Sequence, residues 1–210
     1  GFLKLPAFRE TIAVLDLPGA YSLCPRSLDA EIVHNVLLGR QAGVETPELY
    51  VIVLDARNLE RHLFLATQII EIGKPTVLVL NMWDVTEEKG ITIDIERLSK
   101  LLCVEVVTTI GNRRVGIEAL KKAIEKLLQP QNQSDRAPAF PFLLPESVEK
   151  EREGIEKVIQ DRFETTHCGS KGEALRLLTD QAFRNPFFKE IGKRLKDHVI
   201  EARERLTKEC

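Results

Sequence analysis

Two apolar runs of strand length, each followed at once by a short polar motif, constrain the fold of this chain most. Residues 77–80 lead into Asn81-Met82-Trp83-Asp84, and Val14-Leu15 lead into Asp16-Leu17-Pro18-Gly19. Parallel strands of an open sheet bring their carboxyl ends to one edge, and ligands bind there. The pattern therefore predicts two buried parallel strands whose polar ends line one ligand site.

The Asn-x-x-Asp motif carries groups suited to guanine. An Asp carboxylate only accepts hydrogen bonds and can take two parallel donors at once. Guanine offers such a pair in N1–H and its exocyclic amine, and adenine does not. Asp84 is therefore a candidate for base recognition, with Met82 beside it, and Asn81 can bond the N7 side of the ring and tie neighbouring loops together. Taken alone, Asp84 fits equally well as the cap of a helix or turn.

The Asp-x-Pro-Gly motif suits the phosphate end of a nucleotide. Asp16 would hold Mg²⁺ through water, because this ion keeps several waters and binds through few carboxylates. The N–H of Gly19 would face a γ-phosphate, because glycine has no Cβ to prevent close approach. A plain turn explains this motif when it is considered alone. Together, the two motifs have the order and spacing that a GTP-binding domain requires.

Four strings in the first part of the chain resemble the G domain of the ferrous iron transporter B (FeoB) family. The strings are Asp16-Leu17-Pro18-Gly19-Ala20-Tyr21-Ser22-Leu23, Pro25-Arg26-Ser27, Asp55-Ala56-Arg57-Asn58-Leu59-Glu60-Arg61 and Asn81-Met82-Trp83-Asp84. The resemblance covers residues 2–128. It implies GTP and GDP as ligands, Mg²⁺ as cofactor, and GTP hydrolysis linked to Fe²⁺ uptake. It also implies a cytoplasmic position at the inner membrane, a membrane domain downstream of Cys210, and assembly into an oligomer through the transporter.

The predicted fold class is α/β: a P-loop-NTPase-like G domain, with a mostly parallel sheet flanked by helices, followed by a small all-α helical domain. We expect a partial G domain over residues 1–129, a proline-rich linker over 130–145 and the helical domain over 146–210. The expected strands are 2–5 and 10–15, paired as a hairpin, then 49–55, 75–81 and 104–108 in parallel. The expected helices are 28–39, 58–72, 94–102, 116–128, 146–165, 171–184 and 186–208.

Several local expectations follow from composition. The strand over 49–55 is almost entirely apolar and is expected to be buried on both faces. Asn58 and Asp94 are expected to cap the helices that follow them. Residues 87–90 are polar and are expected to form a solvated loop.

The loop over residues 108–112 falls where domains of this class place a Ser-Ala pair, whose backbone N–H meets guanine O6. Ile110 and Gly111 take those places here. We expect the backbone contact to survive and the Ser hydroxyl to be lost. Base binding would then be weaker but still specific.

No G-x-x-x-x-G-K-[S/T] phosphate loop occurs in the 210 residues. Gly169-Ser170-Lys171-Gly172 has Lys-Gly where that loop needs Gly-Lys, so we expect it to be a helix start. The phosphate loop and the first switch are expected to lie upstream of Gly1, and a first residue other than Met suits a fragment. Most of the affinity for phosphate and Mg²⁺ would then come from the absent part.

In this fold, the strand before the phosphate loop would lie between the strand of Leu15 and the strand of Val53. Without it, buried N–H and C=O groups lose their partners, at a cost of about 1–3 kcal/mol each. A typical domain is stable by only about 5–15 kcal/mol. We therefore expect either poor folding or two exposed strand edges that favour aggregation.

Composition excludes some classes of function. The 30 basic and 32 acidic residues give a net charge of −2, without the basic surplus of a nucleic-acid-binding protein. No apolar run approaches the roughly 18 residues of a membrane span, so this chain alone is expected to be soluble. Two alternatives stay open: another soluble G protein, of the RNA-maturation type, and a non-enzymatic interaction module. Ala20 stands where other GTPases keep a water-orienting group, so the catalytic residue is unknown and hydrolysis by this chain is undecided.

Overall fold

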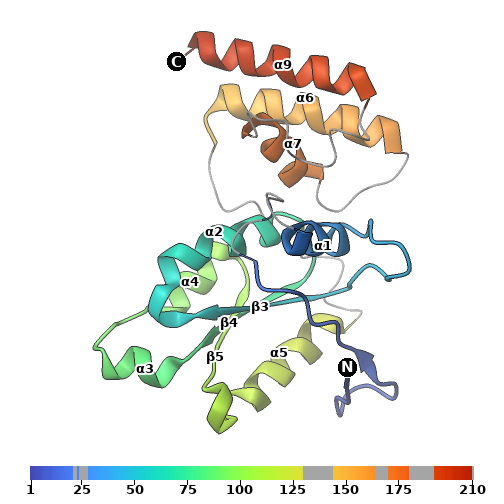
Figure 1. The fold of residues 1–210 in the computed structure, drawn as a ribbon. Coiled ribbons are helices and arrows are strands. Elements are labelled where there is room, and N and C mark those ends of the chain that lie inside the picture. The colour runs from blue at the N-terminus through green and yellow to red at the C-terminus, as the bar shows by residue number, and fades with distance from the viewer. Residues whose placement is uncertain (21–22, 24–27, 130–143, 164–169, 180–191, 210) are drawn as a thin grey trace.

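The computed structural model describes residues 1–20, 23, 28–129, 144–163, 170–179 and 192–209. A parallel sheet flanked by helices lies below a layer formed by helices from the C-terminal part of the chain (Figure 1). The sheet contains β3 (Tyr50–Asp55), β4 (Thr76–Asn81) and β5 (Glu105–Thr108) in that order, all parallel. The predicted α/β class is confirmed.

The helices follow the predicted order. They are α1 (Leu28–Leu37), α2 (Leu59–Ile70), α3 (Trp83–Glu88), α4 (Ile95–Leu102), α5 (Ile117–Leu128), α6 (Glu146–Phe163), α7 (Ser170–Thr179) and α9 (Gly192–Glu209), with short 3-10 turns η1 (Ala56–Asn58) and η2 (Gly111–Arg113). The break expected at Asn185-Pro186 and most of the expected linker lie outside the described residues. The expected helix start near residue 170 is confirmed by the first residue of α7.

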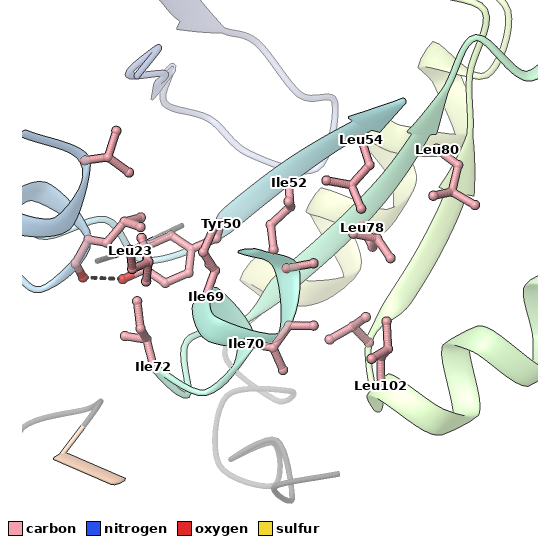
Figure 2. Close-up of a cluster of buried hydrophobic side chains, with 14 of the residues drawn as sticks. Leu23, Tyr50, Ile52, Leu54, Ile69, Ile70, Ile72, Leu78, Leu80 and Leu102 are labelled. Carbon is pink, nitrogen blue, oxygen red and sulfur yellow. Dashed lines mark hydrogen bonds between the residues drawn. The ribbon is translucent and has the colours of Figure 1, made fainter. Parts of the chain in front are cut away.

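Alternate side chains of the sheet face two different cores, as the period of two in a strand requires. Leu78 and Leu80 of β4 pack with side chains of β3, α1, α2 and α4. Figure 2 shows this cluster, with Ile69 and Ile70 of α2 next to the strands. Val77 and Val79 of β4 face the other way, toward α5 and the N-terminal hairpin. β4 is therefore buried from Thr76 to Leu80, and only Asn81 at its end is half-buried.

β3 is not buried on both faces, so that expectation is wrong. Ile52 and Leu54 are buried, but the side chains between them are open: Val51 is 40% exposed and Val53 61%. The reason is the place of β3 at the edge of the sheet, where the core formed with α5 does not reach. An apolar run does not reveal which of its faces a neighbour will cover.

The expected N-terminal hairpin is confirmed, but it is shorter than predicted. β1 (Phe2–Leu3) and β2 (Ile12–Ala13) pair antiparallel in a separate sheet. Val14 and Leu15 were expected to end a buried strand, and this is wrong, because they are 46% and 54% exposed and lie beyond β2. Among the described residues, β2 pairs only with β1 and β3 only with β4. The strand edges expected to lack a partner are therefore seen here, whereas poor folding stays a prediction.

Of two local expectations near α3 and α4, one needs correction and the other is confirmed. Residues 87–90 do not begin as a loop, because Glu87 and Glu88 form the last turn of α3. The Trp83 Nε1–H donates to Glu87 Oε1 at 2.8 Å, one helical turn away, which favours that extra turn. Asp94 caps α4 as expected, its side chain accepting from the Arg97 N–H.

Asn58 stands at the N-cap position of α2, but its side chain does not cap the helix. Its Nδ2 donates to Asp55 Oδ2 at 3.3 Å instead. Asp55 caps the preceding turn η1, because its Oδ1 accepts from the Arg57 N–H within that turn. The expected side-chain cap of α2 is therefore wrong, because the capping bond is made at the turn before it.

The C-terminal helices have a core of their own. α6, α7 and α9 enclose a buried cluster that includes Ile155, Ile159, Leu177, Leu195 and Val199. Among the described residues, no helix combines the length and the apolar composition needed to cross a bilayer.

Gly116 is required where the chain turns from β5 into α5. Its φ is +83°, and a Cβ there would lie 2.1 Å from the Thr108 carbonyl oxygen. Gly90 also has a positive φ, of +67°, but a Cβ there would meet nothing within 4 Å. Alanine at Gly90 would therefore add backbone strain alone, whereas alanine at Gly116 would add both backbone strain and a steric clash.

We expect Gly90→Ala to lower the free energy of unfolding by about 1–2 kcal/mol through strain alone. Gly116→Ala should cost at least about 1 kcal/mol more, because the added methyl group overpacks against backbone. Urea unfolding of both variants measures the difference. Equal losses would contradict the account of this turn.

Candidate functional site

The Asn81 side chain joins the ends of two strands. Asn81 is the last residue of β4, and its Oδ1 accepts hydrogen bonds from Thr109 Oγ1 at 3.1 Å and from the Gly111 N–H at 3.0 Å. Thr109 and Gly111 belong to the loop after β5. The sequence predicted that Asn81 ties neighbouring loops together, and the structure has this link.

Thr109 is a residue of the site that sequence reasoning missed. It is 4% exposed, its N–H donates to Leu80 O at 2.9 Å, and its carbonyl accepts from the Trp83 N–H at 3.3 Å. Together with the hydroxyl bond to Asn81, these contacts fix the β5 loop against the β4 loop. Its only sequence signal is a hydroxyl residue just after an apolar strand, which many turns share.

Met82 turns the chain from β4 into α3. Its φ is +61°, a left-handed conformation that costs a non-glycine residue about 1–2 kcal/mol. The strain is offset locally, because the Met82 carbonyl accepts from both the backbone N–H and the Oγ1 of buried Thr86. This turn places Asp84 in the first turn of α3, next to the end of β4.

The Asp84 carboxylate is 18% exposed, and its closest charged neighbour is Arg113 of η2. The Arg113 Nη2 lies 3.8 Å from Asp84 Oδ2, which is too long for a hydrogen bond, and Arg113 is 64% exposed. A pair this open to water contributes only about 0–1 kcal/mol. Within the described part of the chain, the acceptor positions of this carboxylate are thus open to a ligand.

The backbone of the β5 loop corrects the expected contact with guanine O6. The Ile110 N–H donates to Val115 O at 3.1 Å, and the Gly111 N–H donates to Asn81 Oδ1. Both are used within the chain, because the loop folds back on itself and onto Asn81. The Asn112 N–H is the next along the loop, and it has no acceptor among the described residues.

Asp16 and Gly19 lie in an irregular segment after β2, and both are exposed. A Cβ at Gly19 would meet nothing within 4 Å, so packing inside the described protein does not require glycine there. No hydrogen bond or ion pair joins either residue to the motif of Asn81 and Asp84 in the described ranges. The structure therefore brings Asn81 and the loop after β5 together, but it does not connect them to the segment of Asp16 and Gly19.

Asp55 ends β3 and lies beside Asn81 in the register of the sheet. Its carboxylate accepts from Arg57 Nε at 2.9 Å and from Arg57 Nη2 at 2.7 Å. These bonds outweigh partial desolvation and lower the pKa of Asp55 to about 2. The group is therefore occupied in holding its own loop.

A parallel sheet with helices on both faces, and an Asn-x-x-Asp motif at the end of its central strand, has the fold of a G domain. The chain belongs to the ferrous iron transport protein B family, whose sequence profile matches residues 3–124. The Fe(2+) transporter FeoB of Escherichia coli (strain K12) is 39% identical over 125 residues. The resemblance seen in the sequence is confirmed, and the alternative of an unrelated soluble G protein is excluded.

Solved structures agree with this assignment. The cytosolic domain of L. pneumophila FeoB is 27% identical, with a TM-score of 0.71 over 98% of this chain and 80% of that one. NFeoB from S. thermophilus, bound to GDP.AlF4- and K+, is 28% identical, with a TM-score of 0.74 over 92% of this chain and 70% of that one. The match to the Escherichia coli transporter covers 58% of this chain but only 16% of that protein.

Removing the Thr109 hydroxyl tests the link between the loops. We expect Thr109→Val to lower the free energy of unfolding by about 0.5–1.5 kcal/mol, because Asn81 Oδ1 keeps only one of its two donors. Amide exchange at Gly111 should become faster. Thr67→Val is a matched control, because the Thr67 hydroxyl makes a solvent-exposed bond to Phe64 O within its own helix, α2, and its loss should change stability by less than about 0.5 kcal/mol. Equal effects of the two variants would contradict the role of Thr109.

The lowered pKa of Asp55 gives a prediction for acid. A carboxyl whose pKa is lower in the folded than in the unfolded chain stabilises above its ordinary value, here 3.8, and loses that contribution as the pH falls toward about 2. The difference in unfolding free energy between the parent chain and Asp55→Asn should therefore shrink from about pH 5 to about pH 2. Arg57→Ala should behave in the same way, since it removes the partner. A difference that does not vary with pH would contradict this origin.

Proposed function

We propose that this chain binds guanine nucleotides through the loops after β4 and β5, within a transporter that links GTP binding and hydrolysis to Fe²⁺ uptake. The observation that carries the proposal is the Asn81 side chain, which holds both loops while the Asp84 carboxylate stays free of hydrogen bonds in the described protein. Family membership supports the transporter as its context.

In this proposal the base is recognised at three points. Asp84 accepts from N1–H and the exocyclic amine of guanine, the Asn112 N–H donates to O6, and Asn81 Nδ2 donates to N7, since its Oδ1 is already used. Met82, Ile110 and Gly111 form the surrounding backbone. A base without the right donors would leave Asp84 unpaired, which supports discrimination of roughly 10⁴-fold.

For the phosphate end, we propose that the Gly19 N–H contacts the γ-phosphate and that Asp16 holds Mg²⁺ through water. The exposed Asp16 carboxylate, without a hydrogen bond in the described ranges, fits an ion that binds through few carboxylates and several waters. Mg²⁺ would neutralise phosphate charge. Hydrolysis of this kind depends on positioning and electrostatics more than on covalent chemistry, and no side chain is assigned as catalytic base.

The relatives support these assignments. The S. thermophilus structure is bound to GDP.AlF4- and K+, which supports a guanine nucleotide as the ligand here. The L. pneumophila structure is a cytosolic domain, which supports a position on the cytoplasmic face of the membrane. A membrane domain of the same transporter as partner, assembly of that transporter into an oligomer, and the division into parts over 1–129, 130–145 and 146–210 belong to the same proposal.

The test is a titration of the purified chain with a fluorescent GDP, competed by GTP, GDP and ATP. We expect GTP and GDP, but not ATP, to displace the probe. Binding should be weak, because the chain has no G-x-x-x-x-G-K-[S/T] sequence. Asp84→Asn should weaken binding by roughly 10- to 100-fold, because a hydrogen bond to a charged group is lost.

Asp94→Asn is the matched control. Asp94, like Asp84, lies at the start of a helix, but that helix is α4, so nucleotide binding should be unchanged. Displacement by ATP as effective as by GTP would reject base recognition. A folded chain that binds none of the nucleotides would reject the proposal for this chain and favour a non-enzymatic module.

A further inference from the structure

One charged side chain lies next to the carboxylate that the proposed function assigns to base recognition. Arg113 is the last residue of η2, and its Nη2 lies 3.8 Å from Oδ2 of Asp84. This is the distance of an ion pair without a hydrogen bond. Among the described residues, Arg113 is the cation that pairs with Asp84, so the site holds a positive charge of its own when no ligand is bound.

The backbone of the loop after β5 holds Arg113 at this place. Ile110 and Val115 exchange two backbone hydrogen bonds, of 3.1 and 3.3 Å, which close the loop at its base. Within the loop, the Arg113 N–H donates to Ile110 O at 3.0 Å. The bond from the Gly111 N–H to Asn81 attaches the loop to the end of β4. The carboxylate of the pair follows the same strand end, in the first turn of α3, so both partners are positioned from one point.

The two side chains of the pair differ in their freedom to move. The Asp84 side chain is 18% exposed, whereas the Arg113 side chain is 64% exposed. A long exposed side chain has many rotamers, and water solvates its charge when it swings away. The carboxylate therefore stays in place, while the guanidinium can leave it and return.

The guanidinium of Arg113 offers the same kind of donor that guanine does. Its N–H groups lie side by side in one plane, and this fork matches the two oxygens of a carboxylate. Guanine presents a planar pair as well, in N1–H and the exocyclic amine. The proposed base contact requires both oxygens of Asp84, including Oδ2, the one that faces Arg113. Guanine and the guanidinium thus seek the same acceptor.

We propose that Arg113 is an internal competitor for Asp84: it pairs with this carboxylate in the empty site, is displaced when guanine binds, and so lowers the affinity for guanine nucleotides. The competition rests on the proposed function, because it requires that Asp84 accepts from guanine. It also has a sign of its own. A positive charge near a nucleotide ordinarily strengthens binding by attracting the phosphates, whereas a competitor weakens it.

The exposure of the pair limits the size of the effect. Water and dissolved ions screen an open ion pair, so it contributes little. Its loss on binding should lower nucleotide affinity by roughly 2- to 5-fold. Screening also predicts when the effect vanishes. At about 1 M salt, charges are screened over about 3 Å, which is shorter than the 3.8 Å between Arg113 and Asp84.

The test is an NMR titration of Arg113→Ala and Arg114→Ala with GDP, at about 0.1 M and about 1 M salt. Arg114 is the matched control, because it is the next residue, is also exposed, and takes the same charge away from the phosphates when replaced. Its left-handed φ of +56° strains arginine and alanine alike, since both have a Cβ. Arg113→Ala should bind GDP roughly 2- to 5-fold more tightly than Arg114→Ala at the lower salt. The two affinities should converge at the higher salt.

Binding by Arg113→Ala that is equal to or weaker than binding by Arg114→Ala at the lower salt would overturn the competition. Weaker binding would mean that Arg113 contacts the bound nucleotide instead. Either result leaves the proposed function intact, provided that the parent chain binds GDP. If neither the parent chain nor Arg113→Ala binds GDP, the proposed function fails and the competition fails with it.

The pair in the empty site is tested separately, without nucleotide. Asp84→Asn removes the negative partner, so ¹⁵N relaxation should show the Nε–H group of Arg113 becoming more mobile. The Nε–H group of Arg114 should not change. Equal mobility of the Arg113 group in the parent chain and in Asp84→Asn would overturn the pair, and with it the competition, whatever the GDP titration shows.

Discussion

The side-chain oxygen of Asn81 is the contact on which the rest of the site depends. It accepts from the Thr109 hydroxyl and from the Gly111 N–H, so one amide at the end of β4 holds the loop after β5. This bond decides which groups remain available. It uses the Gly111 N–H and fixes the direction of the Asn81 NH₂ group, while the Asn112 N–H and the Asp84 carboxylate have no hydrogen-bond partner among the described residues.

The sheet explains why the polar groups gather where they do. β4 lies between β3 and β5 and is buried on both faces, so an unpaired polar side chain along its length would be costly. At the end of the strand that cost disappears, and Asn81 and Asp55 stand side by side there. Asp55 is held by Arg57 within its own loop, whereas Asn81 holds the loop after β5. Above this layer, the buried contact of Glu173 with His34 attaches the C-terminal helices to α1.

Sequence reasoning succeeded where the cause is local and failed where it is not. Asp94 as a cap and Asn81 as a link follow from the chemistry of a few neighbouring residues. The exposure of Val53 was missed, because an apolar strand looks the same whether one face is covered or both. The use of the Gly111 N–H, and the contact of His34 with Glu173 far along the chain, depend on how loops and helices meet in space. No periodicity in the sequence encodes such contacts.

The central claim is that the two loops held by Asn81 form a guanine-specific site. The most direct test is a titration of the ¹⁵N-labelled chain with GDP and, separately, with ADP, followed by NMR. The account predicts that GDP shifts the amide resonances of Gly111 and Asn112 and the indole N–H of Trp83, the single tryptophan of the chain, and that ADP leaves them unchanged. Shifts of these resonances that are the same for both nucleotides, or GDP-induced shifts that lie elsewhere, would contradict it.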